Sequence, residues 1–213
     1  MAVRQHGAAL RPAVFLDRDG TINEQMGYIN HLTRFHLLPG VGGAIRTLNE
    51  HDLPVVVVTN QSGLARGYFP ESLLNAVHAE MRRLLAAEGA RIDGLYTCPH
   101  HPEAKEERFR LDCNCRKPKT GLLEQAAAEM GLDLRRSYVV GDRWSDLRCG
   151  AAVGTKTILV LTGYGRGDAC YIGPGQTVQP DYVAEDLAAA VRWILADQGT
   201  CGDHCHGAGE KEP

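Results

Sequence analysis

Short apolar runs alternate with amphipathic segments through most of the chain. The clearest run is Leu53–Thr59, in which four consecutive valines are followed by a polar residue. Uninterrupted β-branched runs of this kind are typical of strands that are buried on both faces of a sheet. Similar runs predict strands at 13–16, 92–97, 137–140 and 156–161, and a short edge strand at 181–183.

Between these runs, apolar residues recur at three- and four-residue spacing, which predicts helices. In the first such segment Val41, Ala44 and Leu48 lie on one stripe, and Pro39 suits a helix start. Further stripes predict helices at 70–89, 120–131 and 185–196. The alternation of strands and helices predicts an α/β fold with a mainly parallel sheet and helices on both of its faces.

The length and composition limit the number of domains and the kinds of partner. A chain of 213 residues predicts a single domain over 1–197, and the Gly-rich polar end predicts a disordered tail over 198–213. A net charge of −3 gives no basic excess, so we expect no nucleic-acid partner. No apolar run reaches the ~20 residues that span a bilayer, and the N-terminal segment lacks a signal-peptide pattern. These features predict a cytoplasmic protein without a membrane partner.

Small groups of polar residues directly follow four of the predicted strands. The first strand leads to Asp17 and Asp19, and the stretch 59–63 follows the second. The third strand leads into a long segment that ends at 116–117, and 141–146 follows the fourth. Each group alone reads as a solvated turn. Because the carboxyl ends of parallel strands meet at one edge of the sheet, we expect the four groups to form one site.

The residue types in these groups are those of phosphoryl-transfer chemistry. Asp17 and Asp142 offer hard oxygen ligands, which suit Mg²⁺. Thr59 and Lys117 offer a hydroxyl group and a positive charge that would hold a phosphoryl group. Of the two neighbouring acids after the first strand, one could attack as a nucleophile while the other transfers protons. A metal-binding pair, an acid/base pair and a plain polar turn are the alternatives for these two acids.

The segment 98–115 has neither helical nor strand periodicity, and a loop of that length inside a compact domain is usually functional. It contains Cys98, Cys113 and Cys115, together with His100 and His101. Three thiolates and one imidazole would form a closed tetrahedral zinc site with a structural role. A loop with free, buried thiols is the alternative.

With these motifs in place, the chain resembles the haloacid dehalogenase (HAD) phosphatase superfamily. The resemblance rests on FLDRDGTIN, VTNQSGLARG, a downstream lysine and VGD, and the motifs CPHH and CNCRKP narrow it to the heptose-bisphosphate phosphatase group. It implies a Rossmann-like three-layer fold without a large cap domain. It also implies Mg²⁺-dependent removal of the C7 phosphate of D-glycero-D-manno-heptose 1,7-bisphosphate through an aspartyl-phosphate, within heptose biosynthesis for lipopolysaccharide. For an enzyme of this size without a cap we expect a monomer.

Two other functions remain open at this point. Histidinol-phosphate phosphatases share this set of motifs, and another small sugar-phosphate phosphatase of the same branch would also fit. A zinc-organised binding module with an inactive site is a third interpretation, although every catalytic position is filled by a competent residue. Turnover of simple phosphate esters with and without Mg²⁺ would separate the last interpretation from the other two.

The resemblance also assigns roles to single residues. It implies that Asp17 is the nucleophile and a Mg²⁺ ligand, and that Asp19 is the general acid/base and gives its main-chain carbonyl to the metal. It implies that Asp142 completes the Mg²⁺ site, that Asp146 supports these ligands or only starts a helix, and that His100 is the zinc-binding histidine. The implied substrate-binding residues are Gln25, Met26, Gly27, Tyr28, Thr59, Asn60, Gln61, Ser62, Arg66, Arg116, Lys117 and Arg143.

Three segments near the expected sugar end of the site carry further expectations. The family often has an acidic residue where this chain has Gln25, and a lysine where it has Arg143. Both differences leave the phosphoryl chemistry unchanged and bear on the substrate. The stretch 63–67 is expected to be a mobile substrate loop, with a plain turn as the alternative.

Overall fold

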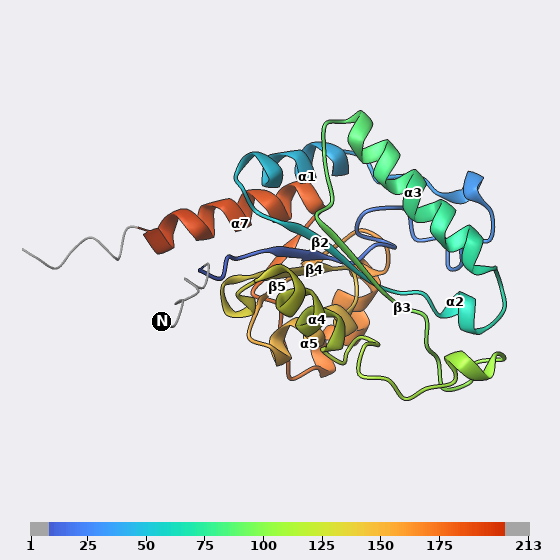
Figure 1. Cartoon of the computed structure of the whole chain (residues 1–213). Helices are drawn as coiled ribbons and strands as arrows, with labels where there is room; N and C mark the ends of the chain where they lie inside the picture. Colours follow the sequence, from blue (N-terminus) through green and yellow to red (C-terminus); the bar gives the residue numbers. More distant parts are fainter. Residues whose placement is uncertain (1–8, 203–213) are drawn as a thin grey trace, which may run out of the picture.

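The computed structural model of the chain describes residues 9–202 and contains one six-stranded sheet in the order β3-β2-β1-β4-β5-β6 (Figure 1). Every neighbouring pair of strands is parallel. The fold class predicted from the alternation of strands and helices is therefore confirmed. The strands are β1 (Val14–Leu16), β2 (Val55–Asn60), β3 (Gly94–Cys98), β4 (Tyr138–Gly141), β5 (Lys156–Val160) and β6 (Tyr182–Ala184).

The central strands are largely apolar because both of their faces are covered. All three residues of β1 are fully buried, and Val14 pairs with Val55 of β2 on one side and with Tyr138 of β4 on the other. This register brings the carboxyl ends of β1, β2 and β4 to the same edge of the sheet. Asp17 and Asp142 follow β1 and β4 directly, so that both side chains start at that edge.

Helices cover the sheet on both faces, as Figure 1 shows. One face packs against α1, α3 and α7 and contains the larger apolar cluster, while α4 and α5 cover the other face. The stripe predicted for the first helix is buried, with Ile45 and Leu48 fully inaccessible. These helices span α1 (Val41–Glu50), α3 (Glu71–Ala87), α4 (Gly121–Met130), α5 (Trp144–Ala152) and α7 (Leu187–Gly202).

Short helical turns make up most of the connections around the carboxyl edge. They are η1 (Leu32–Arg34), α2 (Ser62–Ala65), η2 (Glu107–Phe109), α6 (Gly165–Gly167), η4 (Asp168–Ile172) and η5 (Gly173–Gly175). A further turn, η3 (Leu134–Arg136), precedes β4 at the opposite edge. The segment 98–115 starts at the last residue of β3, and beyond that residue η2 is its only regular element in the described chain. The expectation that this segment lacks extended secondary structure therefore agrees with the fold.

Two local predictions need correction. Part of the stretch 63–67 is helical, because α2 spans Ser62–Ala65 and buries Leu64 and Ala65 against the segment 98–115. The last helix does not stop at Ala196 but continues to Gly202, so the predicted tail begins several residues too early. The rest of that predicted tail, 203–213, lies outside the described residues.

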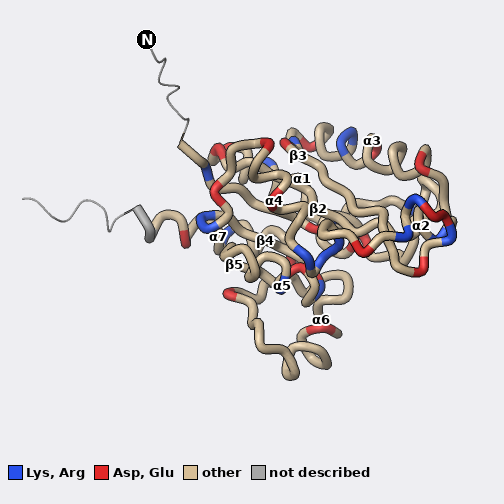
Figure 2. Tube along the Cα trace, turned by 60° about the horizontal axis from the view of Figure 1, so that its bottom comes forward, with Lys and Arg blue, Asp and Glu red and all other residues tan. Residues whose placement is uncertain are grey.

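Acidic and basic residues are mixed along the described chain (Figure 2). Figure 2 shows acidic and basic residues interspersed along it, with both signs close together near the start of α5. Among residues 9–202 no helix combines the length and the apolar character that a bilayer-spanning segment requires.

Candidate active site

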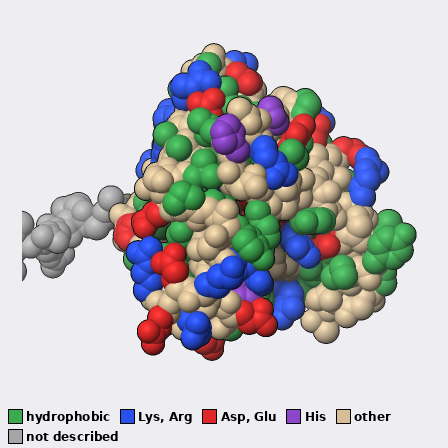
Figure 3. All heavy atoms as spheres, turned by 90° about the vertical axis from the view of Figure 1, so that its right-hand side faces the viewer, with side chains coloured by type: hydrophobic (Ala, Val, Ile, Leu, Met, Phe, Trp, Pro, Cys, Tyr) green, Lys and Arg blue, Asp and Glu red, His purple; other side chains and the backbone are tan. Residues whose placement is uncertain are grey.

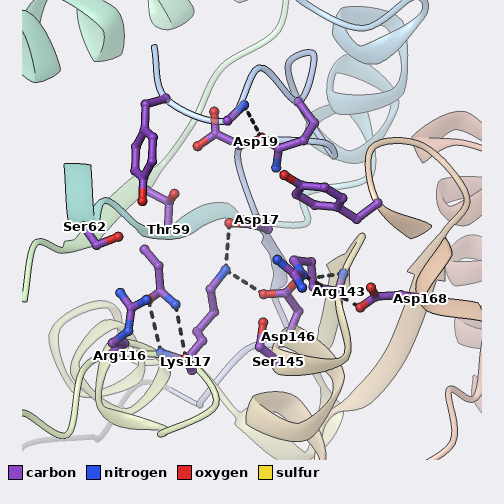
Figure 4. Close-up of a pocket in the computed structure, with 15 residues that line it drawn as sticks. Asp17, Asp19, Thr59, Ser62, Arg116, Lys117, Arg143, Ser145, Asp146 and Asp168 are labelled. Carbon is purple, nitrogen blue, oxygen red and sulfur yellow. Dashed lines mark hydrogen bonds and ion pairs between the residues drawn. The ribbon is translucent and has the colours of Figure 1, made fainter. Parts of the chain in front are cut away.

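A cavity of about 450 Å³ opens at the carboxyl edge of the sheet. Figure 3 shows this face of the molecule, where basic and hydrophobic side chains border a hollow, and Figure 4 shows the cavity in close-up. All four groups of polar residues that follow the strands contribute to it. The cavity is lined by Asp17, Asp19, Gln25, Gly27, Tyr28, Thr59, Asn60, Ser62, Arg116, Lys117, Arg143, Ser145, Asp146, Tyr164 and Asp168.

The floor of the cavity is a buried lysine between two carboxylates. Lys117 Nζ lies 2.7 Å from Asp17 Oδ1 and 2.7 Å from Asp146 Oδ1, and it donates a hydrogen bond to the carbonyl oxygen of Val58 at 2.8 Å. Figure 4 shows the lysine side chain pointing toward both acids. Burial alone would lower the pKa of Lys117, but the two carboxylates outweigh it and raise that pKa above its ordinary value. Lys117 is therefore a fixed positive charge at the bottom of the cavity.

Asp146 has a second contact that fixes its direction. Its Oδ2 accepts a hydrogen bond from the main-chain N–H of Arg143 at 3.1 Å, as the capping box of α5 requires. The same carboxylate thus starts a helix and pairs with Lys117. Both interpretations of Asp146 offered by the sequence are present in the structure, one on each oxygen.

Asp142 completes a compact group of carboxylates with Asp17 and Asp146. One oxygen from each of the three can be chosen so that all lie within 4.8 Å of one another. Asp142 Oδ2 accepts from the main-chain N–H of Tyr164 at 2.8 Å, while its buried Oδ1 has no hydrogen-bond partner among residues 9–202. A buried carboxylate oxygen without a donor beside other carboxylates fits a cation, and hard oxygen ligands of this kind suit Mg²⁺.

The pKa values of these acids also favour a bound cation. Burial and the charges of Asp17 and Asp146 raise the pKa of Asp142 to about 8. Burial likewise raises the pKa of Asp17 to about 6, although Lys117 opposes this shift. The three acids cannot all ionise cheaply without an additional positive charge, because like charges at this spacing repel in a buried site.

The Asp19 carboxylate accepts hydrogen bonds from a different set of side chains. Its Oδ1 accepts from Arg18 Nη2 at 2.9 Å and from Asn23 Nδ2 at 3.0 Å, and its Oδ2 accepts from Arg18 Nη2 at 2.8 Å and from Gln61 Nε2 at 2.7 Å. Burial would raise the pKa of Asp19, but the Arg18 charge and these hydrogen bonds lower it overall. The resting side chain is a carboxylate surrounded by donors.

Side chains at the carboxyl end of β2 and just beyond it form hydrogen bonds with Asp19 and with Lys117. Gln61 Nε2 also donates to Thr59 Oγ1 at 2.9 Å, so one amide group connects Thr59 with Asp19. The Asn60 amide forms two hydrogen bonds with the main chain of Lys117, accepting from its N–H at 3.1 Å and donating to its carbonyl at 3.2 Å. The Asn60 side chain therefore holds Lys117 in place. The sequence had predicted only that Asn60 contacts the substrate.

The rim residues predicted from the sequence divide into two sets. Gln25, Gly27, Tyr28, Ser62, Arg116 and Arg143 line the cavity, and Figure 4 shows Ser62 and Arg116 on one side of it and Arg143 on the other. Two predicted rim residues, Met26 and Gln61, do not line the cavity; Met26 packs against the main core, and Gln61 is buried beneath Asp19.

Arg66, the last of the predicted rim cations, requires a correction. It does not line the cavity, because its guanidinium contacts His101 Nε2 at 2.8 Å and lies 3.9 Å from Glu103. Both partners belong to the segment 98–115. Arg66 therefore joins α2 to that segment instead of facing the cavity.

The four predicted zinc ligands come together beside β3. The Sγ atoms of Cys98, Cys113 and Cys115 lie 3.1–3.6 Å apart, and His100 Nδ1 lies 3.3 Å from Cys115 Sγ. Sulfur atoms bound to one zinc ion at about 2.3 Å in a tetrahedron are separated by a little under ~4 Å, which is close to this spacing. Burial raises the pKa of the Cys98 thiol, so a cation is needed to keep three adjacent thiolates ionised.

The structure also adds residues that the sequence did not single out. Ser145, Tyr164 and Asp168 line the cavity, and the buried Arg18 contacts His78 Nε2 of α3 at 3.2 Å. Only the position of Ser145 inside the motif GDRWSD was a possible signal. Tyr164 and Asp168 belong to a Gly-rich stretch after β5 whose sequence resembles an ordinary loop.

Comparison with known proteins agrees with this site. A family described as HAD-hydrolase-like matches residues 114–190. The D-glycero-D-manno-heptose-1,7-bisphosphate 7-phosphatase of Thermosynechococcus vestitus is 45% identical over 86% of this chain and 95% of its own length. The D-glycero-beta-D-manno-heptose-1,7-bisphosphate 7-phosphatase of Escherichia coli K12 is 46% identical over 71% of this chain and 80% of its own length.

Among solved structures, the D,D-heptose 1,7-bisphosphate phosphatase of B. bronchiseptica, complexed with magnesium and phosphate, matches with a TM-score of 0.78 and 37% identity. The match covers 87% of this chain and 99% of that one. The chain therefore belongs to the HAD-like hydrolases, a family of phosphatases, and within them to the D-glycero-D-manno-heptose-1,7-bisphosphate 7-phosphatases.

Proposed function

We propose that this protein removes the C7 phosphate of D-glycero-D-manno-heptose 1,7-bisphosphate in a Mg²⁺-dependent reaction that passes through an aspartyl-phosphate. The observation that carries the proposal is Asp17, held by Lys117 at 2.7 Å beside Asp142 at the floor of the cavity. The overall similarity to enzymes named for this reaction supports the choice of substrate.

Asp17 is the nucleophile in this proposal. A carboxylate oxygen of Asp17 attacks the phosphorus atom, and the bond between phosphorus and the C7 oxygen of the sugar breaks. Lys117 fixes the rotation of the attacking carboxylate through Oδ1 and neutralises charge on the phosphoryl oxygens. Thr59 Oγ1 and nearby main-chain N–H groups hold those oxygens from the other side of the floor.

Asp19 transfers the protons. In the first step its carboxyl group protonates the leaving C7 oxygen, and in the second its carboxylate takes a proton from the water molecule that attacks the aspartyl-phosphate. Phosphate is then released and Asp17 is restored. The donors around Asp19 favour the carboxylate needed in the second step. A phosphate dianion that enters the cavity adds negative charge near Asp19. This charge raises the proton affinity of the Asp19 carboxylate, which must be protonated for the first step.

Asp17 and Asp142, together with the main-chain carbonyl of Asp19, would hold the Mg²⁺ ion, and Asp146 supports them through Lys117. A bound Mg²⁺ ion supplies charge neutralisation for the phosphoryl group and lets neighbouring acids ionise together. Cys98, His100, Cys113 and Cys115 would hold one structural Zn²⁺ ion. We place the enzyme in the cytoplasm as a monomer, with no nucleic-acid or membrane partner and one domain over 1–197.

A phosphate-release assay tests the proposal directly. We expect the purified protein to hydrolyse both anomers of the heptose bisphosphate, with one preferred, and to lose activity without Mg²⁺. Histidinol phosphate and p-nitrophenyl phosphate are the comparison substrates. A higher kcat/KM for histidinol phosphate than for either anomer would reject the heptose assignment, and turnover that does not depend on Mg²⁺ would reject the role of the carboxylates.

A further inference from the structure

The segment 162–168, between β5 and η4, is attached to the floor of the cavity at two points. Thr162 Oγ1 donates to the carbonyl oxygen of Gly20 at 2.6 Å, and the N–H of Tyr164 donates to Asp142 Oδ2 at 2.8 Å. Gly163 makes this approach possible, because its φ is +54° and a Cβ atom there would lie 2.2 Å from Asp142 Oδ2. The segment is therefore fixed relative to the reacting groups.

Three side chains from this segment and from the start of α5 form one side of the cavity, which we call the Arg143–Tyr164–Asp168 wall. The guanidinium carbon of Arg143 lies 4.7 Å from the centre of the Tyr164 ring, and Arg143 Nε lies 3.8 Å from Asp168 Oδ2. All three residues line the cavity together with Asp17 and Lys117. Figure 4 shows Arg143 and Asp168 on the side opposite Arg116.

The exposure of these side chains shows which groups are available to a ligand. Tyr164 is 44% exposed, whereas Asp168 is only 7% exposed. Asp168 Oδ2 accepts from the N–H of Trp144 at 3.0 Å, which fixes the carboxylate. Its Oδ1 has no hydrogen-bond partner within residues 9–202 and belongs to a side chain that lines the cavity. A nearly buried, oriented carboxylate is thus offered to the contents of the cavity.

The composition of the wall favours hydroxyl groups over a phosphate. A carboxylate accepts hydrogen bonds from hydroxyl groups, a guanidinium donates to them, and an aromatic ring packs against the C–H face of a sugar. A phosphate dianion would be repelled by Asp168, which also neutralises much of the Arg143 charge. On the opposite side, Arg116 Nη1 donates to the carbonyl oxygen of His100 at 3.3 Å, and because Arg116 forms no ion pair with the described acids its charge is available to a phosphate.

We propose that the Arg143–Tyr164–Asp168 wall binds the hydroxyl groups and the C–H face of the sugar, and that it determines specificity for a polyhydroxylated substrate. The second phosphate is left to Arg116 across the cavity. This proposal rests on the proposed function, since it names the part of the site that reads the sugar of the heptose bisphosphate.

Two substitutions test the wall without disturbing its attachment. Asp168→Asn keeps an oxygen that accepts from the N–H of Trp144, and Tyr164→Leu keeps the main-chain N–H that donates to Asp142. Tyr171→Ala is the matched control, because Tyr171 lies in the same connection, is 87% exposed and does not line the cavity. Melting temperatures of all three variants establish that they are folded.

The variants are assayed with heptose 1,7-bisphosphate, with heptane-1,7-diol bisphosphate, which has both phosphates and no hydroxyl group, and with p-nitrophenyl phosphate. For the sugar we expect each wall variant to lose about tenfold or more in kcat/KM, mainly through KM, because lost contacts to hydroxyl groups weaken binding. The loss on the other two substrates should be at least about fivefold smaller, because they have no hydroxyl group to lose. Tyr171→Ala should match the wild type on all three.

Equal losses on all three substrates would overturn the proposal and assign the wall a structural role. Equal losses on the two bisphosphates with a smaller loss on p-nitrophenyl phosphate would also overturn it, because the wall would then serve the second phosphate. In both cases the wild type still hydrolyses the heptose bisphosphate, so the proposed function stands. If instead the wild type hydrolyses p-nitrophenyl phosphate but neither heptose anomer, the proposed function itself fails.

Discussion

The carboxylate group at the cavity floor and the thiolate group beside β3 reach similar compactness by different means. Asp17 and Asp142 follow buried strands directly, so the sheet fixes their positions whether or not an ion is bound. Cys113 and Cys115 lie at the end of a segment whose regular structure is one short turn, and they are only partly buried at the border of the smaller apolar cluster. The comparison teaches that a cation at the first group would serve chemistry, while a cation at the second would hold together a segment with little regular structure of its own.

The strongest test of the catalytic side of this comparison is Asp17→Asn. We expect turnover to fall by a factor on the order of 10⁴ or more, because the covalent step loses its nucleophile. The melting temperature should change little, since the side chain keeps its volume. Asp112→Asn, at an exposed carboxylate in the segment 98–115, is the control and should retain full activity. Retention of more than about a tenth of wild-type kcat would mean that another residue attacks phosphorus.

The structural side of the comparison is tested by Cys113→Ser. Loss of a thiolate should weaken ion binding and lower the melting temperature on the order of 10 °C, equivalent to roughly 3 kcal/mol in a chain of this size. We expect kcat to fall less than stability. Cys170→Ser, at an exposed free thiol, is the matched control. Freshly purified wild-type protein should contain about one zinc ion per chain by elemental analysis; a metal-free preparation with the same melting temperature would contradict the structural role.

The pH dependence of stability sharpens the contrast further. In the Mg²⁺-free protein the pKa of Asp142 is about 8, against an ordinary value of 3.8, so the folded state binds more protons than the unfolded state between these values. The free energy of unfolding therefore falls as pH rises through this window. His78, whose pKa burial and Arg18 lower to about 4, has the opposite effect, but only below its ordinary value of 6.5.

The window from pH 6.5 to 8 lies above the ordinary pKa of His78 and above the raised pKa of Asp17, about 6, so Asp142 dominates it in the zinc-loaded protein. We expect the melting temperature of the Mg²⁺-free protein to fall across it, and the stabilisation by added Mg²⁺ to grow, because the ion binds the ionised carboxylate. Thermal unfolding with and without Mg²⁺ at several pH values is the measurement. A Mg²⁺-induced stabilisation that shrinks with rising pH over this window would contradict the assignment of Asp142.

The smallest expected effect concerns the contact between α2 and the segment 98–115. Arg66→Ala removes the contact with His101 that joins α2 to the segment 98–115. Because the ion pair with Glu103 is largely solvated, we expect a loss of stability of about 1 kcal/mol or less and a modest rise in KM. Lys105→Ala, in the same segment, keeps its main-chain hydrogen bond to Ala65 and is the control. A loss of kcat comparable to that of Asp17→Asn would show that Arg66 enters the cavity.

The sequence was sufficient for those features that depend on local pattern. Four valines can follow one another in β2 because both faces of that strand are covered. Asp17 stands out because it follows a similar apolar run directly. Other features depend on distant contacts. Arg18, between two acids, reads as a surface charge, yet it is 2% exposed because His78 and Asp19 receive its guanidinium.

The direction in which a side chain points was harder to predict than the element on which it lies. Arg66 was expected at the rim with Arg116 and Arg143, but a side chain of that length can point either way from α2, and His101 decides the direction. Asp168 lies 22 residues beyond Asp146 in a polar stretch, and only the packing of η4 against α5 brings it to the cavity. Such residues have no signature in a single sequence.

The two hydrogen bonds between Asn60 and the main chain of Lys117 have an evolutionary consequence. Lys117 follows the last thiolate by two residues, yet it is also tied to β2 independently of any ion. A lineage that lost its cysteines one by one would keep the lysine in register with Asp17 while the loop was rebuilt around other contacts.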